Sequence, residues 1–227
     1  MAERFAARGF ALGLCARHEP SAPRTAAGSD AAVTAAVDVT DAAAVDAFCS
    51  RVVERFGRVD LWVNNAGLLA PIVQLRNADP GALRANVEAN VLGVMYGSAA
   101  FARHVRARPG GGVLVNITSG AATTPYEGWA AYCASKAAVD HLTRVVAVEE
   151  ADAGLRAFAV APGVVDTGMQ AAIRSTPAER FPAVERFNEM KRRDAFNSPA
   201  WVADHIMGLL ASGPEADLVQ RVPDEPR

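Results

Sequence analysis

The chain has 227 residues, of which 51% are hydrophobic, and its formal net charge is −2 at pH 7. This length and apolar content suffice for the core of one domain. The nearly balanced charge gives no general attraction to nucleic acid or to an anionic membrane, so we expect neither as a partner. No uncharged apolar run approaches the length of a membrane span, and the charged N-terminus does not resemble a signal peptide.

The cysteines and histidines show no ligand spacing. Cys15, Cys49 and Cys133 form no CxxC pair, and the four histidines are isolated from one another. This pattern is typical of reduced thiols in a cytoplasmic protein, and it predicts no metal site.

Apolar runs and helical periodicity alternate along the chain. Strands are predicted at 11–16, 33–37, 61–63, 113–118, 155–160 and 218–222. Helices are predicted at 1–8, 40–56, 81–106, 128–153 and 199–210, with a polar helical excursion over 167–195. We therefore expect an α/β fold with a doubly wound, Rossmann-type parallel sheet, in a single domain over 1–227.

Polar residues follow several of the predicted strands. Asp38, Asn64, Ser119 and Pro162 all fall at strand ends. Because the carboxyl ends of parallel strands share one edge of a sheet, we expect the ligand site at this edge.

Tyr132 and Lys136 lie four positions apart in a predicted helix, so both project from one helix face. A positive charge near a phenol favours the phenolate, and this spacing predicts a proton-delivery site. The chain has 23 Lys and Arg together but only two lysines, so a Lys at this position is unlikely to be a chance of composition.

Six motifs occur in a consistent order. They are Asp38-Val39-Thr40-Asp41, Asn64-Asn65-Ala66-Gly67, Asn90-Val91-Leu92-Gly93, Ser119, Tyr132-Cys133-Ala134-Ser135-Lys136 and Pro162-Gly163-Val164-Val165-Asp166-Thr167. On these motifs the chain resembles the short-chain dehydrogenase/reductase family over essentially its whole length. Residues 164–170 are similar to the sepiapterin reductase and benzil reductase branch of that family.

The resemblance implies a role for each catalytic residue. Tyr132 would give a proton to the substrate carbonyl, and Lys136 would lower the pKa of Tyr132 and hold the nicotinamide ribose. Ser119 would donate a hydrogen bond to the carbonyl, and Asn90 would shape its helix and anchor a water relay. Together with Tyr132 and Lys136, the cofactor-binding residues that the resemblance implies are Asp38, Val39, Asn64, Ala66, Gly67, Pro162, Val165 and Thr167.

Arg17 indicates which dinucleotide the chain uses. An acidic residue after this strand would bind the ribose 2′-hydroxyl of NAD, whereas Arg accommodates the 2′-phosphate of NADP. Arg17 follows the strand at 11–16, and no acidic residue occurs before Glu19. The sequence therefore favours NADP, with a surface arginine as the alternative interpretation.

The chain departs from the family at its beginning. Family members open with a buried strand and a Gly-rich turn that receives the pyrophosphate. Residues 1–9 match only the later part of the following helix, so the sheet is expected to lack its first strand, between 11–16 and 61–63. The chain is then either a piece of a longer protein or a genuinely truncated one.

The expected function is that of an NADPH-dependent carbonyl reductase acting on a small ketone or dicarbonyl. Two alternatives stay open: a catalytically silent relative that acts as a subunit or binding module, and a 3-oxoacyl-thioester reductase. A homodimer or homotetramer is expected to form through the helices at 81–106 and 128–153. The segment 167–195 is expected to be a lid over the substrate.

Overall fold

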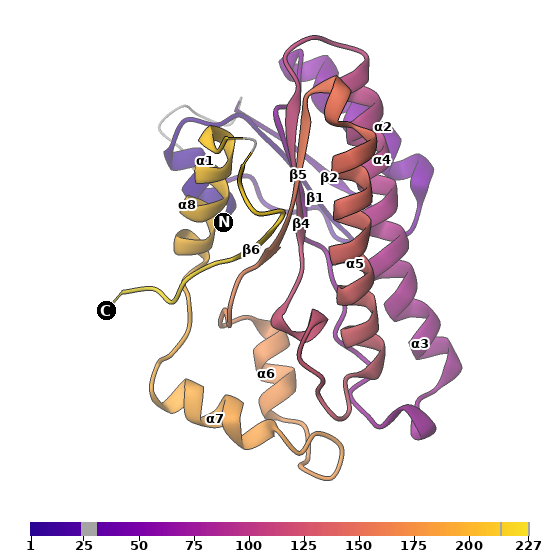
Figure 1. Cartoon of the computed structure of the whole chain (residues 1–227), viewed down its shortest axis with the longest axis vertical. Coiled ribbons are helices and arrows are strands. Elements are labelled where there is room, and N and C mark those ends of the chain that lie inside the picture. Colours follow the sequence, from indigo (N-terminus) through magenta and orange to yellow (C-terminus); the bar gives the residue numbers. More distant parts are fainter. Residues whose placement is uncertain (24–30, 214, 227) are drawn as a thin grey trace.

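The computed structural model describes residues 1–23, 31–213 and 215–226 of the chain (Figure 1). Its strands are β1 (Leu12–Ala16), β2 (Ala32–Ala36), β3 (Leu61–Asn64), β4 (Gly112–Ile117), β5 (Leu155–Ala161) and β6 (Val219–Arg221). Each paired strand runs parallel to its neighbour. The expected α/β fold with parallel, doubly wound strands is confirmed.

Helices cover both faces of the strands (Figure 1). One face carries α1 (Ala2–Ala7) and α8 (Pro199–Gly208), and the other carries α2 (Ala42–Phe56), α4 (Gly93–Arg106) and α5 (Ala130–Glu149). The remaining helices are α3 (Pro80–Val87), α6 (Gly168–Arg174) and α7 (Val184–Arg192), a π-helical turn at Glu88–Leu92, and 3-10 turns at Leu75–Asn77, Gly120–Ala122, Ala151–Ala153 and Leu209–Ala211.

The core consists of apolar layers between the strands and these helices. Phe158 and Val160 of β5 pack with Val202 and Ile206 of α8 on one face. On the other face, Leu114 of β4 and the helical Phe101, Val105 and Val146 form a buried cluster. β4 and β5 are buried on both faces, which explains why their sequences are nearly continuous apolar runs.

Local sequence signals set the ends of α2. The Asp41 carboxylate accepts hydrogen bonds from the backbone N–H groups of Ala43 (2.9 Å) and Ala44 (3.1 Å). Gly57 ends the helix at φ 81°, a conformation that favours glycine. Asp41 therefore caps the helix that the sequence predicts over 40–56.

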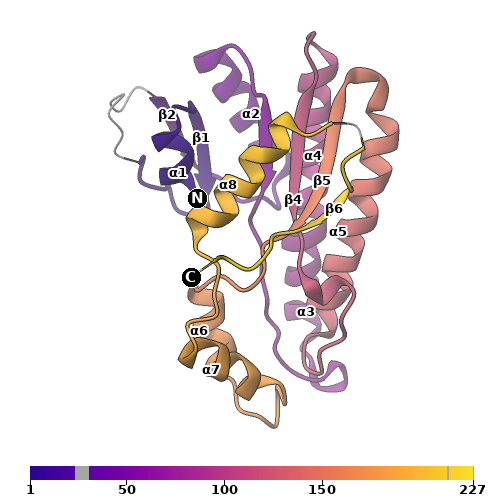
Figure 2. The same ribbon diagram turned by 60° about the vertical axis from the view of Figure 1, so that its left-hand side comes forward.

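The strands form two sheets among the described residues, rather than one. β1 pairs with β2, while β3, β4, β5 and β6 form a second sheet in that order. β1 and β3 do not pair with each other, as expected for a sheet without the strand between them. Figure 2 shows β1 and β2 set apart from β4, β5 and β6. Residues of β1 are half-buried or exposed, in contrast to the buried β4 and β5.

The long helix expected at 81–106 is divided. α3 passes through the π-helical turn at Glu88–Leu92 before α4 begins. Asn90 lies in this turn, and its side chain forms hydrogen bonds with the backbone of Leu68, outside the helix. The π-helical turn therefore occurs where a helix residue holds a neighbouring loop. The helix expected at 128–153 ends earlier, at Glu149, and Gly154 (φ 73°) closes the 3-10 turn that follows it.

Candidate active site

Tyr132 and Lys136 lie on adjacent turns of α5, next to the carboxyl end of β4. The Lys136 Nζ atom is 5.6 Å from the centre of the Tyr132 ring. Ser119 follows β4, and its hydroxyl lies near enough to the Tyr132 phenol to oppose the effect of burial on the pKa of that phenol. The structure therefore brings these three sequence-predicted residues together.

Lys136 is a buried cation with one hydrogen-bond contact to the main chain. Its side chain is 4% exposed, and Nζ donates to the carbonyl oxygen of Ile117 at 2.8 Å. Burial lowers the pKa of Lys136 to about 8, although the charge of Asp140 acts in the opposite direction. An amine that titrates near neutral pH is typical of functional sites.

The pKa of Tyr132 moves opposite to expectation. We expected Lys136 to lower it, but the pKa of Tyr132 is raised because burial disfavours the phenolate, and the hydrogen bond with Ser119 opposes this only in part. The side chain is 7% exposed. Desolvation therefore decides the direction of the shift, and the phenol keeps its proton at neutral pH.

Asn90 is completely buried and holds the loop that follows β3. Its Oδ1 accepts from the Leu68 N–H at 2.7 Å, and its Nδ2 donates to the Leu68 carbonyl at 2.7 Å and to the Ser135 hydroxyl at 3.1 Å. Asn86 shares the task, since its Nδ2 donates to the carbonyls of Leu68 and Ala70. Asn86 is a positioning residue that the sequence motifs did not identify.

Gly67 lies close to the side chains of Asn90 and Lys136 and also lines the neighbouring cavity. A Cβ atom at this position would lie 3.4 Å from Asn90 Oδ1 and 3.7 Å from Lys136 Nζ. The bare backbone of Gly67 thus leaves room for a ligand close to both polar groups.

A cavity of about 510 Å³ extends from Gly67 toward the unpaired edge of β1. Its lining includes most of the residues expected to bind the cofactor: Arg17, Asp38, Val39, Asn64, Ala66 and Gly67. Apolar side chains of Val37, Phe48 and Trp62 complete its walls. A cavity with an apolar wall and polar groups at its rim suits a nucleoside.

Arg17 and Asp38 lie at the exposed rim of this cavity. The Asp38 carboxylate accepts from the Thr40 N–H (2.9 Å) and the Thr40 hydroxyl (2.8 Å). These hydrogen bonds, with a smaller contribution from the charge of Arg17, lower the pKa of Asp38. Asp38 is therefore ionised at neutral pH and is fixed by its own turn rather than by an ion pair.

Asn64 has its side-chain atoms engaged by the protein. Its Nδ2 donates to Asn116 Oδ1 at 2.8 Å and to Ser98 Oγ at 3.2 Å, while its Oδ1 accepts from Trp62 Nε1 at 2.8 Å. Asn116 in turn donates to Thr143 on α5. This buried network ties β3 and β4 to α4 and α5, so the contribution of Asn64 is to fix the cavity wall.

The remaining predicted cofactor residues, Pro162, Val165 and Thr167, lie on the loop after β5. Asn197 holds this loop: its Nδ2 donates to the Pro162 carbonyl at 3.0 Å, and its backbone N–H donates to the Val164 carbonyl at 2.8 Å. A side chain at Gly163 would clash with Asn197. Thr167 begins α6. Asn197 has no local motif that would have revealed its role.

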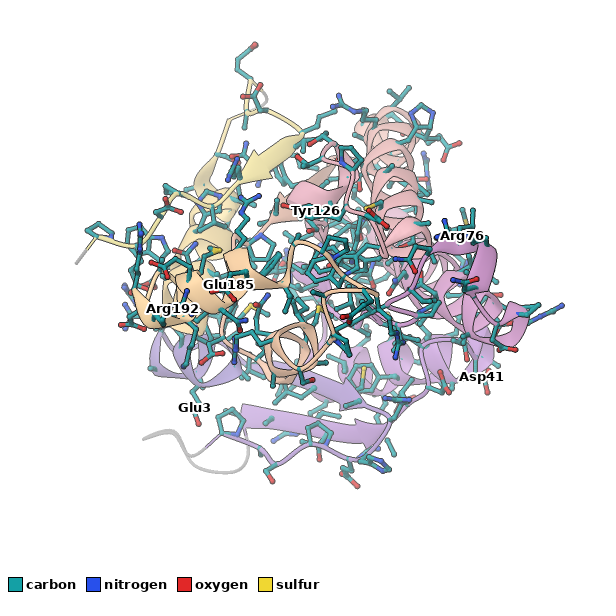
Figure 3. The ribbon with its side chains drawn as sticks, turned by 90° about the horizontal axis from the view of Figure 1, so that it is seen from below. Glu3, Asp41, Arg76, Tyr126, Glu185 and Arg192 are labelled. Atoms are coloured by element: carbon teal, nitrogen blue, oxygen red, sulfur yellow. The ribbon has the colours of Figure 1, made fainter. Side chains whose placement is uncertain are left out.

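Aromatic side chains cover the Tyr132 phenol. Trp129 contacts the Tyr132 ring edge-on at 5.8 Å, and Phe181 stacks on Trp129 at 4.6 Å. Phe187 of α7 and Tyr126 complete the cluster. Figure 3 views this edge from below, with Tyr126 near the middle and Glu185 and Arg192 of α7 toward the left.

Two further properties of the described residues bear on function. No helix in this part of the chain is long and apolar enough to span a bilayer. The same residues contain no group of three or more His, Cys, Asp or Glu side chains with the geometry to hold a metal ion.

Parallel strands, a nucleoside-sized cavity at their carboxyl ends and an adjoining Ser-Tyr-Lys group define a nucleotide-binding α/β protein of the oxidoreductase type. A family model described as short chain dehydrogenase matches residues 1–178. The chain belongs to the short chain dehydrogenase family.

Two curated relatives and one solved structure are similar to the chain. Benzil reductase ((S)-benzoin forming) of Bacillus subtilis (strain 168) is 37% identical over 164 residues, 71% of this chain and 67% of the relative. The Bacillus cereus protein of the same name is 40% identical over 150 residues, 65% of this chain but only 60% of its own length. A 3-ketoacyl-(acyl-carrier-protein) reductase from Brucella melitensis, complexed with NADH, is 27% identical with a TM-score of 0.80, covering 97% of this chain and 89% of that chain.

Proposed function

We propose that this chain is an NADPH-dependent carbonyl reductase that acts on small ketones or dicarbonyls. The observation that carries the proposal is the buried, protonated phenol of Tyr132, held by Ser119 beside Lys136 and next to the cavity. The benzil reductases named above support a dicarbonyl as substrate.

The residues of this chain fit a nicotinamide dinucleotide. Arg17, Asp38 and Val39 would hold the adenosine half of the dinucleotide, and Ala66 and Gly67 would contact its middle part. Lys136 would bind the nicotinamide ribose, for which the open space at Gly67 leaves room. A second set, Pro162, Val165 and Thr167, would contact the nicotinamide end. When bound, NADPH supplies the hydride to the carbonyl carbon.

Proton delivery is the task of the protein's own side chains. Ser119 donates a hydrogen bond to the substrate carbonyl, and Tyr132 transfers its phenolic proton to the same oxygen as the C=O bond becomes an alcohol. The Lys136 ammonium stabilises the phenolate that remains. Asn90 keeps the 67–68 backbone in place beside Lys136 through its hydrogen bonds to Leu68. One hydride and one proton are consumed for each alcohol formed.

Loss of NADPH absorbance in the presence of benzil tests the proposal directly. We expect turnover with benzil that depends on both reagents. Acetoacetyl-coenzyme A serves as the probe for the 3-oxoacyl-thioester alternative, which the Brucella melitensis structure favours. Absence of turnover with every carbonyl, together with absence of dinucleotide binding, would support the catalytically silent alternative instead.

Arg17→Ala is expected to weaken NADPH binding by about tenfold or more and to leave NADH binding nearly unchanged. The reason is that a charge-assisted hydrogen bond to the 2′-phosphate exists only with NADPH. Dissociation constants measured by nicotinamide fluorescence check this, with Arg51→Ala on the exposed face of α2 as the control. Equal losses for the two dinucleotides would make Arg17 a structural residue.

We further propose a homodimer or homotetramer built on the outer faces of α4 and α5. Met95 of α4 and Val145 and Val148 of α5 are exposed apolar residues, and Val148 is 79% exposed. Small exposed residues beside them, Ala134 and Ala138, permit close approach of a second copy.

Val145→Glu combined with Val148→Glu is expected to shift the protein toward monomer, because four or more carboxylates would face one another across a two-fold axis. Light scattering across micromolar concentrations gives the mass. The change Glu54→Ala, at an exposed position of α2, is the control. A wild-type chain that is monomeric throughout this range would contradict the proposal.

We also propose that the protein works in the cytoplasm, which its three free cysteines support.

A further inference from the structure

Trp129 carries a buried N–H group that lacks an acceptor. Its side chain is 4% exposed, and Nε1 has no hydrogen-bond partner in the described part of the chain. A buried donor without an acceptor forfeits the hydrogen bond that it would make with water, so native proteins rarely keep one without a reason. An indole is also easily replaced by an apolar ring at a purely structural position.

The location of Trp129 points to the reacting group. It precedes α5 and lies one helical turn before Tyr132, and the two rings meet edge to face with centres 5.8 Å apart. Other buried side chains among the described residues also carry an unpartnered polar atom, but Trp129 is the one with its ring against the Tyr132 ring. The unused donor thus adjoins the group that we propose to protonate the substrate.

The surroundings of Trp129 favour flat, aromatic molecules. Phe181 stacks on the indole with an interplanar angle of 3° and a centre distance of 4.6 Å, and Phe187 lies 5.5 Å away. Tyr126 packs on the indole at 4.8 Å. A phenyl group of a substrate finds the same stacking partners here.

The segment that covers Trp129 is attached through its buried apolar side chains, such as Phe181, and through ion pairs at its outer side. Phe181 and Phe187 belong to the segment 167–195, whose ion pairs from Asp166 to Lys191 and Arg174 are exposed or partly exposed. Such pairs are screened by water and contribute little. A ligand that takes the place of the buried Phe181 ring would uncover the face of the Trp129 indole on which Phe181 stacks.

We propose that Trp129 determines specificity by donating its indole N–H to the oxygen that does not react in an aromatic vicinal dicarbonyl. This inference rests on the proposed reductase function and deepens it to a substrate class. The two oxygens of such a compound are attached to adjacent carbons. A substrate that places one oxygen on Tyr132 and Ser119 therefore holds the other within the neighbourhood of Trp129. A monoketone of the same shape leaves the N–H unpaired.

Two substrates that differ only at the second oxygen separate this role from packing. Benzil has two adjacent carbonyls between its phenyl rings, and deoxybenzoin has a methylene in place of one carbonyl. We expect Trp129→Phe, which keeps an aromatic ring but removes the N–H, to lower kcat/KM for benzil by about tenfold or more. The kcat/KM for deoxybenzoin is expected to change by less than about threefold, because that substrate never used the N–H.

Trp201→Phe is the matched control, since Trp201 Nε1 donates to the Pro223 carbonyl at 2.9 Å away from the site. It removes the same group and is expected to leave the benzil to deoxybenzoin ratio unchanged. Equal losses for both substrates in Trp129→Phe would overturn the inference and make Trp129 a packing residue.

Binding measured without turnover distinguishes this inference from the proposed reaction. We expect benzil to raise the melting temperature of the wild type more than deoxybenzoin does, and Trp129→Phe to lose that difference. If the wild type shows the difference but reduces neither compound, the proposed function fails while the assignment of Trp129 stands. If the two compounds shift the melting temperature of the wild type equally, the assignment is wrong.

Discussion

Tyr132→Phe is expected to lower carbonyl reduction by about 10²- to 10⁴-fold, the usual contribution of a positioned general acid. Burial raises the pKa of Tyr132, so the phenol carries its proton at neutral pH and is ready for the reductive direction. Phe keeps the ring that packs on Trp129 and removes only the hydroxyl. The loss should therefore fall on kcat, with dinucleotide binding and the melting temperature nearly unchanged.

Tyr126→Phe is the matched control for this experiment. Tyr126 belongs to the same aromatic cluster, and its hydroxyl accepts a hydrogen bond from Arg186 at 3.3 Å rather than bonding with Ser119. We expect its turnover to stay within a few-fold of the wild type. Near-normal turnover in Tyr132→Phe would remove Tyr132 from the reaction.

The sequence was sufficient to predict the grouping of the catalytic side chains. The four-residue spacing of Tyr132 and Lys136 has a single geometric outcome on a helix, and Ser119 had to follow β4 because a buried apolar run precedes it. The interrupted sheet was likewise predictable, since a parallel sheet that lacks an inner strand leaves two unpaired edges.

The sequence was insufficient where burial depends on distant segments. The direction of the Tyr132 pKa shift was predicted wrongly because Tyr132 lies in a buried cluster with Phe181 and Phe187, which approach it only in the folded chain. The roles of Asn197 and Asn86 were missed for the same reason: each side chain holds a backbone loop far from it in sequence. A spacing rule describes one element, whereas desolvation and loop anchoring depend on several.

The cavity is lined by residues of both β1 and β3, the two strands beside the interruption of the sheet. Its lining combines residues of the ligand-binding edge, such as Asp38 and Gly67, with apolar side chains of α2 and β3, such as Phe48 and Val63. Exposed strand edges carry unsatisfied N–H and C=O groups, which favour pairing with another extended segment. The part of the cavity beside Gly67 is the part that adjoins Lys136, so proton delivery in the proposed reaction takes place at that end.

Lys136→Met is expected to lower kcat/KM by about 10²- to 10³-fold, the typical loss when one preorganised electrostatic contact is removed. Met has a similar length but no charge, so it would neither stabilise the Tyr132 phenolate nor bind the ribose. Because the pKa of Lys136 is about 8, wild-type activity should decline as the pH rises above that value. The residual activity of Lys136→Met should lack this decline, and pH profiles of kcat/KM for the two proteins check it.

The same substitution should act in the opposite direction on stability. The pKa of Lys136 is about 8 in the folded chain, against an ordinary value of 10.5 for a lysine. Between these two values the unfolded chain binds more protons, so the wild-type free energy of unfolding rises with pH. Below pH 8 the buried ammonium costs on the order of 3 kcal/mol by this linkage. Met removes that cost and loses the hydrogen bond to Ile117, worth about 1 kcal/mol. Urea unfolding at pH 7 should therefore find Lys136→Met at least as stable as the wild type. If Lys136→Met loses both stability and activity, Lys136 holds the fold. If the variant loses activity but is at least as stable as the wild type, the charge of Lys136 serves the reaction.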